Sequence, residues 1–151
     1  MAQDGFDFRY QKILDFKQHQ EKALELELAR LDTAVLAQRQ SRRRWDMTRR
    51  QVLDQMGGAR REGDLAHAAQ CADYLRHVRR QMKNCDERLD ELQRERERVR
   101  RELEKIMRSR KAVENYRDRM KKLFMVEREK AEQKVVDLHA ARKFIEAEEG
   151  S

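Results

Sequence analysis

The sequence contains no proline, and it has only five glycines and two cysteines among its 151 residues. The absence of proline removes the commonest interruption of a long helix, and the scarcity of glycine leaves few places for tight turns. Cys71 and Cys85 would lie about 21 Å apart on one helix, at roughly 1.5 Å per residue, which is too far for a disulfide bond. Both are therefore expected to be free thiols that pack as small apolar residues.

Long apolar runs are also missing, and aromatic residues make up only 6% of the chain. Without an 18-residue apolar stretch or a secretory h-region, the sequence predicts a soluble, cytoplasmic protein. Charge is abundant instead: 43% of the residues are charged and the net charge is +7. This composition is typical of long solvated helices with a thin core, and we expect one coiled-coil domain over residues 1–151.

The second half of the chain carries a continuous heptad pattern from Leu75 to Ile145. Steps of three and four residues alternate throughout, and most of the positions reached are apolar, which is how a long helix buries a narrow stripe against a partner helix. We therefore predict a helix over about residues 64–147. The pattern begins with Leu75, Val78, Met82, Cys85, Leu89, Leu92, Arg96, Val99 and Leu103, and continues to Leu138, Ala141 and Ile145.

A second heptad pattern, from Tyr10 to Met56, predicts a first helix over about residues 7–56. Three of the five glycines then fall between residues 57 and 63. Gly57 is expected to cap the first helix and Asp64 to begin the next one, with the turn at about residues 57–63. The predicted fold class is all-α, an antiparallel two-helix coiled-coil hairpin with a longer second helix.

The register of this hairpin follows from the position of its turn. With the turn centred near Arg60, residue i on the first helix faces approximately residue 120 minus i on the second. Leu28 then lies opposite Leu92, and Leu31 opposite Leu89, so that apolar layers coincide. This agreement favours an antiparallel hairpin within one chain over a parallel dimer. Polar residues interrupt the layers and are expected to fix the register; they are Gln38, Arg96 and Arg110.

The predicted helices differ in length, so residues beyond about Arg117 have no partner within the chain. The apolar pattern nevertheless continues from Met120 to Ile145, over some 40 Å of helix. We interpret this stripe as a docking surface, because exposed apolar stripes mark interaction sites. Two alternatives stay open, namely self-association into a dimer and a partly frayed helix end.

Groups that carry out catalysis are not recognisable in the sequence. It has no glycine motif for phosphate and no nucleophile elbow, and its four histidines are scattered. His67 and Cys71 lie one helical turn apart, but no second pair completes the four ligands of a structural zinc site. We therefore predict no catalytic residues, no bound metal and no cofactor, and an enzyme is the least favoured class.

Positive charge is concentrated around the predicted turn. Only Asp46 and Asp54 lie among the arginines of the first helix, and Arg76, Arg79 and Arg80 of the second helix lie beside them. Such a surface attracts an acidic protein, anionic lipid head groups or nucleic acid phosphates, and it also serves simply as a solvated end. We call it the basic tip; it comprises Arg42, Arg43, Arg44, Arg49, Arg50, Arg60 and Arg61.

Both ends of the chain resemble the flagellar export protein FliJ family. The opening run, residues 6–17, reads FDFRYQKILDFK, with an aromatic and basic start followed by a Leu-Asp pair. Residues 110–114, RKAVE, and residues 132–144, EQKVVDLHAARKF, are similar to the family's C-terminal stretch. The resemblance covers nearly the whole chain, and the predicted hairpin with its longer second helix agrees with it.

This resemblance implies a non-enzymatic part of the flagellar type III export apparatus. Members form a coiled coil similar to the central stalk of rotary ATPases, insert into the hexameric export ATPase ring and contact the export gate protein FlhA. The residues expected to bind the ATPase ring are Phe6, Phe8, Leu14, Met120, Phe124, Asp137, Leu138, Arg142 and Ile145. Those expected to bind the gate are Tyr74, Val78, Gln81 and Cys85.

The resemblance also implies export chaperones as partners. It places the protein in the cytoplasm, peripherally associated with the inner membrane at the flagellar base, as a monomer or with weak self-association and without a specific nucleic acid. A nucleic-acid-associated coiled coil acting through the basic tip stays open as an alternative, as does a structural homodimer. The sequence does not separate flagellar from injectisome export.

Overall fold

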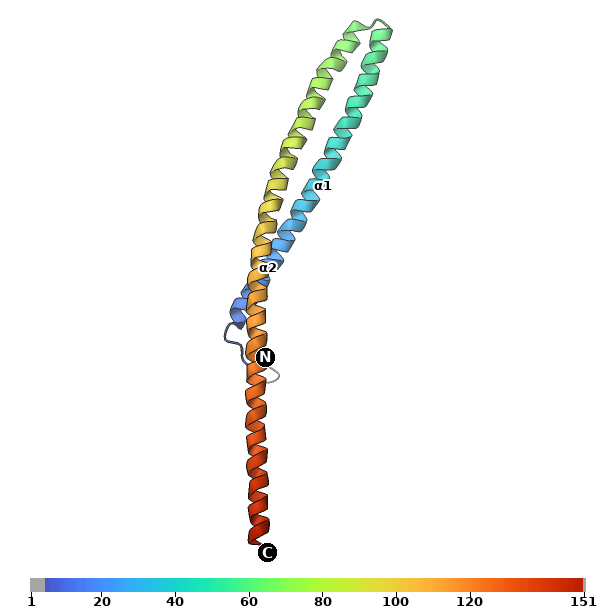
Figure 1. The fold of residues 1–151 in the computed structure, drawn as a ribbon. Helices are drawn as coiled ribbons and strands as arrows, with labels where there is room; N and C mark the ends of the chain where they lie inside the picture. Colours follow the sequence, from blue (N-terminus) through green and yellow to red (C-terminus); the bar gives the residue numbers. More distant parts are fainter. Residues whose placement is uncertain (1–4, 151) are drawn as a thin grey trace. The chain divides into compact units, whose positions relative to one another are not determined.

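The computed structural model describes residues 5–150, and this part of the chain contains two helices and no strand. Helix α1 spans Gln11–Arg61 and helix α2 spans Leu65–Glu149 (Figure 1). The helices have 51 and 85 residues, respectively, and they pack against each other in opposite directions. The prediction of an all-α hairpin with a longer second helix is confirmed.

The turn between the helices is a Schellman motif followed directly by an N-cap. The amide of Asp64 donates to the carbonyl of Ala59 over 2.9 Å, and the amide of Gly63 donates to that of Arg60 over 3.2 Å. Gly63 has a φ of 76°, in the left-handed region that favours glycine. The Asp64 carboxylate then accepts a hydrogen bond of 3.0 Å from the amide of His67, so the predicted N-cap of the second helix is confirmed.

Gly57 does not cap the first helix, contrary to the prediction. Both Gly57 and Gly58 lie inside α1, which continues to Arg61 and shortens the turn to residues 62–64. Glycine inside a helix is unfavourable by about 1 kcal/mol relative to alanine. Here the helix continues because Ala59, only 4% exposed, still packs in the interface between the helices.

The described chain falls into two compact units, and the first of them is Glu21–Lys105. Two apolar clusters lie between its helices. The larger one buries Leu31, Val35, Leu92 and Val99, with Leu24, Leu28, Ala34 and Leu89 packed around it. The smaller one, nearer the turn, buries Val52, Cys71 and Leu75 against Met56. Both free cysteines, Cys71 and Cys85, are buried among the apolar residues, as predicted.

Contacts between the helices of this unit show a register different from the predicted one. In four cross-helix pairs the two residue numbers add to between 122 and 128, whereas the predicted register required 120. The cause is the turn, whose centre is Gly63 and not Arg60. The four pairs are Asp32–Arg96, Ser41–Cys85, Arg42–Asp86 and Trp45–His77.

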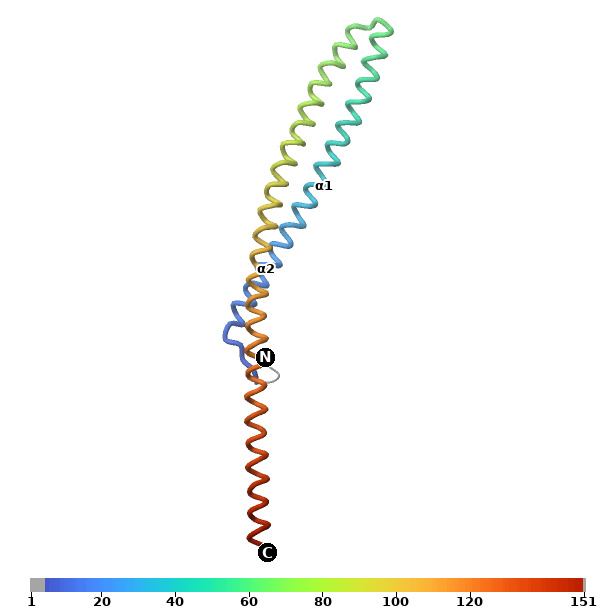
Figure 2. Tube along the Cα trace, in the orientation of Figure 1, coloured from blue at the N-terminus to red at the C-terminus, as the bar shows by residue number. Residues whose placement is uncertain are grey.

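The second unit comprises the described parts of Met1–Gln20 and Ile106–Ser151. Residues 5–10 precede α1 and are not helical, so the prediction that the first helix begins near residue 7 was too early (Figure 2). Gly5 has a φ of 77°. Residues 6–8 have no regular secondary structure, and residues 9 and 10 form a turn that leads into α1.

Candidate docking surfaces

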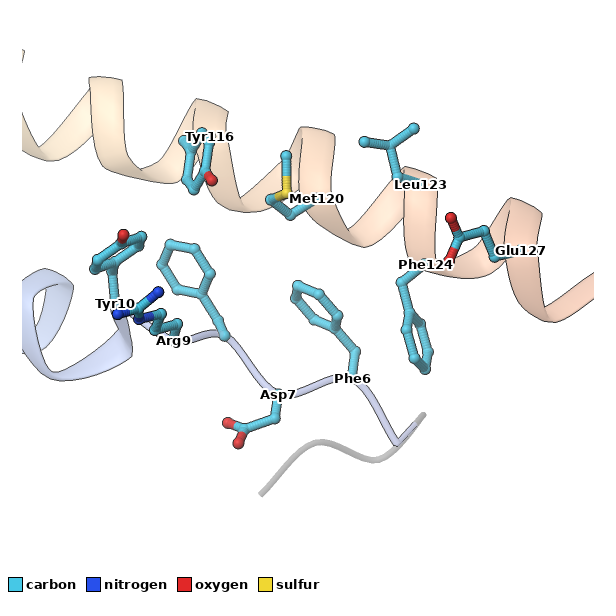
Figure 3. Close-up of a pocket in the computed structure, with 10 residues that line it drawn as sticks. Phe6, Asp7, Arg9, Tyr10, Tyr116, Met120, Leu123, Phe124 and Glu127 are labelled. Atoms are coloured by element: carbon cyan, nitrogen blue, oxygen red, sulfur yellow. The ribbon is translucent and has the colours of Figure 1, made fainter.

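The N-terminal segment packs its aromatic rings against α2 (Figure 3). The ring centroids of Phe6 and Phe124 are 5.5 Å apart, and those of Phe8 and Tyr116 are 6.2 Å apart. Tyr10 lies 6.0 Å from Tyr116, ring to ring. Tilted and edge-on arrangements at these separations are favourable for aromatic pairs. The segment is therefore held on α2 by an aromatic cluster.

Beside this cluster lies a depression of about 400 Å³ lined by residues of both segments. Met120 and Leu123 line it from α2, and Phe6 lines it from the N-terminal segment (Figure 3). Phe124 and Met120 are therefore partly covered by this chain itself. The expectation that residues beyond about Arg117 have no partner within the chain was wrong for the stretch up to Glu127, because the N-terminal segment lies over it.

The helix beyond the cluster is exposed throughout, from Arg128 to Glu149. Leu138 and Ile145 of the predicted ring-binding set are 67% and 54% exposed, respectively. Asp137 accepts a hydrogen bond of 2.9 Å from the side chain of Gln133, and Arg142 is exposed. The apolar side chains exposed over this length are Val135, Val136, Leu138, Phe144 and Ile145.

The nine residues predicted to bind the ATPase ring therefore fall into two groups. Phe8 and Leu14 are buried, at 8% and 0% exposure, and Phe6, Met120 and Phe124 are half-buried at the aromatic cluster. The other four residues lie on the exposed helix. A partner that does not displace the N-terminal segment meets mainly the second group, which is Asp137, Leu138, Arg142 and Ile145.

The residues predicted to bind the export gate are also divided by burial. Val78 and Cys85 are 0% and 7% exposed, since they face α1, whereas Tyr74 is 45% exposed and Gln81 is half-buried. His77 stacks on Tyr74 with ring centroids 5.9 Å apart, and the ring centroids of Trp45 and His77 are 5.7 Å apart in a T-shaped arrangement. The surface available to a partner is therefore a ring cluster of three residues next to Gln81.

Two members of this ring cluster, Trp45 and His77, were not among the predicted gate residues. The predicted register, in which residue i faces residue 120 minus i, places Trp45 opposite Leu75. Its ring contact with His77 depends on the register between the helices, and the predicted register did not bring these two residues together. A register centred on Gly63 places Trp45 opposite Gln81, one turn of α2 after His77, so the turn position alone does not give this contact.

Several arginines of the basic tip are held by carboxylates. Asp86 accepts a hydrogen bond of 2.5 Å from Arg42 Nε, and this bond, followed by the charge of Asp86, raises the pKa of Arg42 above its ordinary value. Asp46 lies 2.9 Å from Arg49 and 3.2 Å from Arg50. Arginine is charged at every physiological pH, so this shift leaves the charge of Arg42 unchanged.

The remaining arginines of the tip are more open. Arg61 donates to the carbonyl of Gly57 over 3.3 Å, one turn earlier in α1. Arg43, Arg44 and Arg60 are exposed, and within residues 5–150 they have no ion-pair partner. In the predicted basic tip, Arg42, Arg49 and Arg50 are therefore paired with carboxylates. The other side chains of the tip have no ion pair among residues 5–150.

Farther from the turn, the predicted polar layer at Arg96 is an ion pair at the edge of the interface. Arg96 Nε lies 2.8 Å from Asp32 Oδ1, and both atoms are excluded from solvent without hydrogen-bond geometry. An unpaired charge at such a site would be unfavourable. The pair therefore ties one position of α1 to one position of α2.

No group of three or more histidine, cysteine or acidic side chains that could hold a metal ion occurs between residues 5 and 150. His67 Nε2 lies 3.9 Å from Cys71 Sγ, a contact between two neighbouring turns of α2. Neither described helix is long and apolar enough to cross a membrane. The candidate docking surfaces are therefore the exposed apolar residues of α2, the ring cluster and the basic tip.

These features define a class of protein, a two-helix coiled-coil hairpin that presents an exposed helix end, a ring cluster and a basic tip. A family model described as flagellar FliJ protein matches residues 6–149, nearly the whole chain. The chain belongs to the FliJ family, as its two ends predicted, and this membership implies a component of flagellar protein export. Comparison with curated proteins and with solved structures found no match.

Proposed function

We propose that this protein is a non-enzymatic stalk that engages the flagellar export ATPase ring through the exposed end of α2. The observation that carries the proposal is the run of exposed apolar residues after the aromatic cluster, in a chain of the FliJ family. Exposed Leu138 and Ile145 lie seven residues apart, two helical turns, and so share one face of α2. A surrounding ring would supply the apolar contacts that this face lacks.

Charged residues on the same stretch of α2 are expected to add little to the binding affinity. Arg128 pairs with Glu132 over 3.3 Å, and comparable ion pairs between exposed side chains contribute little to stability. Charges of this kind influence the rate and orientation of encounter more than the affinity. We expect affinity to come from the apolar face and orientation to come from the charged flanks.

In the compact unit Glu21–Lys105, we propose that the ring cluster contacts the export gate protein FlhA. Tyr74 and His77 present stacked rings at the surface, and Trp45 supports them from α1. Buried Val78 and Cys85 would then position this surface and would not touch the partner. Export chaperones and a site at the cytoplasmic face of the inner membrane belong to the same proposal.

The proposal is tested with the double variant Leu138→Asp/Ile145→Asp. ATP hydrolysis by the cognate export ATPase is measured with and without the protein, together with co-elution at moderate salt. We expect the variant to lose co-elution and any effect on hydrolysis. Its helical content should change little, because both side chains are exposed and make no described contact across helices.

A matched control keeps the same charge change on the other side of the same helix. Ala140 and Ala147 are exposed and lie about 180–200° around α2 from Leu138 and Ile145. Ala140→Asp/Ala147→Asp is therefore expected to retain both co-elution and the effect on hydrolysis. If the double variant at Leu138 and Ile145 binds the ATPase as well as wild type does, the apolar face is not the docking surface.

A further inference from the structure

The excess of positive over negative charge in this protein comes from one segment of the hairpin, residues 39–83. Residues 39–83 contain twelve arginines and lysines against five aspartates and glutamates, a net charge of +7. The whole chain also has a net charge of +7, so the rest of the sequence is balanced. All residues of this segment belong to the compact unit Glu21–Lys105.

The contacts between the helices identify two lateral sides of this segment. Arg42 and Asp86 meet on one side, where Asp46 also pairs with Arg49 and Arg50. The residues of each heptad can be labelled a to g, with Arg42 and Leu75 at position a and Trp45 and Val78 at position d. This side then presents positions a, e and b of both helices, because e and b come next to a around the helix. The opposite side presents positions d, g and c, and it contains the Trp45–His77 and Ser41–Cys85 contacts.

Nearly all of the excess charge lies on the first of these sides. Nine basic residues of the segment occupy its positions, against one acidic residue, Asp46; Asp86 lies on the same side just beyond the segment, and both carboxylates are paired with arginines. The opposite side of the same segment carries one charged residue, Arg44. The basic side consists of Arg39, Arg42, Arg43, Arg49, Arg50 and Arg60 of α1 and Arg76, Arg79 and Lys83 of α2.

Four of these side chains have no ion-pair partner within residues 5–150. They are exposed and lie on both helices. Others keep much of their surface in solvent despite a carboxylate neighbour: the side chains of Arg50 and Arg76 are 72% and 73% exposed. The four without a partner are Arg39, Arg43, Arg60 and Arg79.

Three exposed leucines lie on the same side, two within residues 39–83 and one, Leu36, just before Arg39. Leu36 and Leu53 occupy positions b and e of α1 and are 58% and 39% exposed, and Leu65 occupies position e at the start of α2 and is 74% exposed. The basic side therefore presents arginines and single apolar side chains together. This combination is typical of helices that lie on an anionic membrane, where basic groups meet the head groups and apolar side chains enter the boundary layer.

We propose that the basic side of residues 39–83 binds the surface of an anionic phospholipid bilayer directly. The basic side chains favour a partner with negative charge. The three exposed leucines favour a partner that has an apolar layer beneath that charge. A nucleic acid would make no use of these leucines, and the ring cluster that could stack on bases lies on the opposite side. The residues involved are separate from those proposed for the ATPase ring, so either proposal can fail alone.

The test is co-sedimentation of the full chain with two kinds of vesicles, phosphatidylcholine alone and phosphatidylcholine mixed with phosphatidylglycerol in equal parts. Wild type is expected to bind the mixed vesicles only, and less at high salt. The variant Arg39→Gln/Arg43→Gln/Arg60→Gln/Arg79→Gln should bind about 600-fold more weakly, since each of the four basic residues near an anionic surface contributes roughly fivefold.

A matched variant removes the same charge elsewhere. Arg30, Arg94, Arg119 and Lys130 are exposed, lie off the basic side and have no ion-pair partner in the described chain. Their replacement by glutamine should leave vesicle binding within about twofold of wild type, because none of the four residues belongs to the basic side. Equal losses in both variants would mean that only net charge matters, and would overturn the proposal, as would absence of wild-type binding.

A third variant separates lipid from nucleic acid. Leu36→Asn/Leu53→Asn/Leu65→Asn leaves every charge in place and should weaken binding to mixed vesicles about tenfold, because the apolar contribution is lost. Circular dichroism verifies that each variant keeps its helical content. If wild type binds duplex DNA but not mixed vesicles at the same salt concentration, the partner is nucleic acid and the proposal is overturned.

Discussion

Three glycines lie near the turn, but only one of them is required by the backbone. Gly63 has a φ of 76°, which a residue with a side chain adopts only with strain, whereas Gly57 and Gly58 have ordinary helical conformations. A Cβ atom built at Gly57 or Gly58 would meet nothing within 4 Å. These two glycines therefore weaken α1 without a structural reason.

Opposite effects are expected from alanine at these positions. Gly57→Ala and Gly58→Ala should each raise the free energy of unfolding by about 0.5–1 kcal/mol, since alanine loses less backbone freedom in a helix. Gly63→Ala should lower it by about 1 kcal/mol because of its positive φ. Urea denaturation followed by circular dichroism measures all three. A stabilised Gly63→Ala variant would contradict the Schellman turn.

Burial separates leucines that hold the hairpin together from leucines whose side chains are exposed. Leu92 is 2% exposed inside the larger apolar cluster, so Leu92→Ala should destabilise the protein by about 2–3 kcal/mol. Leu138 is 67% exposed, and Leu138→Ala should change stability by less than about 0.5 kcal/mol. Thermal denaturation of the two variants side by side provides the comparison.

The N-terminal segment is an element that the heptad pattern did not reveal. Its aromatic rings pack on α2 without helical backbone, and periodicity detects only side chains that repeat along a helix. We expect Phe6→Ala/Phe8→Ala to release it and to accelerate amide hydrogen exchange around Tyr116 and Phe124, because the rings that cover this stretch of α2 would be lost.

An exposed phenylalanine offers the control for this variant. Phe16 is 61% exposed on α1. Phe16→Ala should therefore leave exchange around Tyr116 unchanged. Equal protection in the double variant and in wild type would show that the segment does not cover α2 in solution.

The hairpin itself could be predicted from the sequence, but its register could not. A heptad pattern specifies which residues face the partner helix, and it repeats every seven residues. The observed contacts are shifted by about six residues from the predicted pairing. A shift so close to one heptad still places apolar layers opposite each other, so the agreement of layers did not discriminate between the two registers.

The turn decides between these registers, and two candidate turns were present. Gly57 precedes Gly63 along the chain and satisfies the same sequence rule for a helix C-cap. The burial of Ala59 between the helices selects the later glycine, and this packing is a tertiary effect. For the same reason the ring contacts of Trp45 with His77 and of Phe124 with Phe6 could not be predicted from the heptad pattern.

At the scale of the whole molecule, stability is distributed unevenly. From Arg128 to Glu149 every residue is exposed, and an isolated helix of this length is marginal in water. We expect its amides to exchange in the shortest labelling times, whereas amides around Leu31 and Leu92 remain protected. Ending the chain after Glu127 should leave that protection unchanged, which mass spectrometry of exchanged peptides verifies.

The single tryptophan has a consequence for how partners are observed. Trp45 touches His77 on the side of the hairpin that carries the ring cluster, and the basic side has no tryptophan. Intrinsic fluorescence excited at the indole band therefore originates from one lateral side alone. A ligand on the ring cluster should alter the emission, and a ligand on the basic side should leave it constant. The protein thus contains its own optical label, without any chemical modification, for distinguishing its two sides.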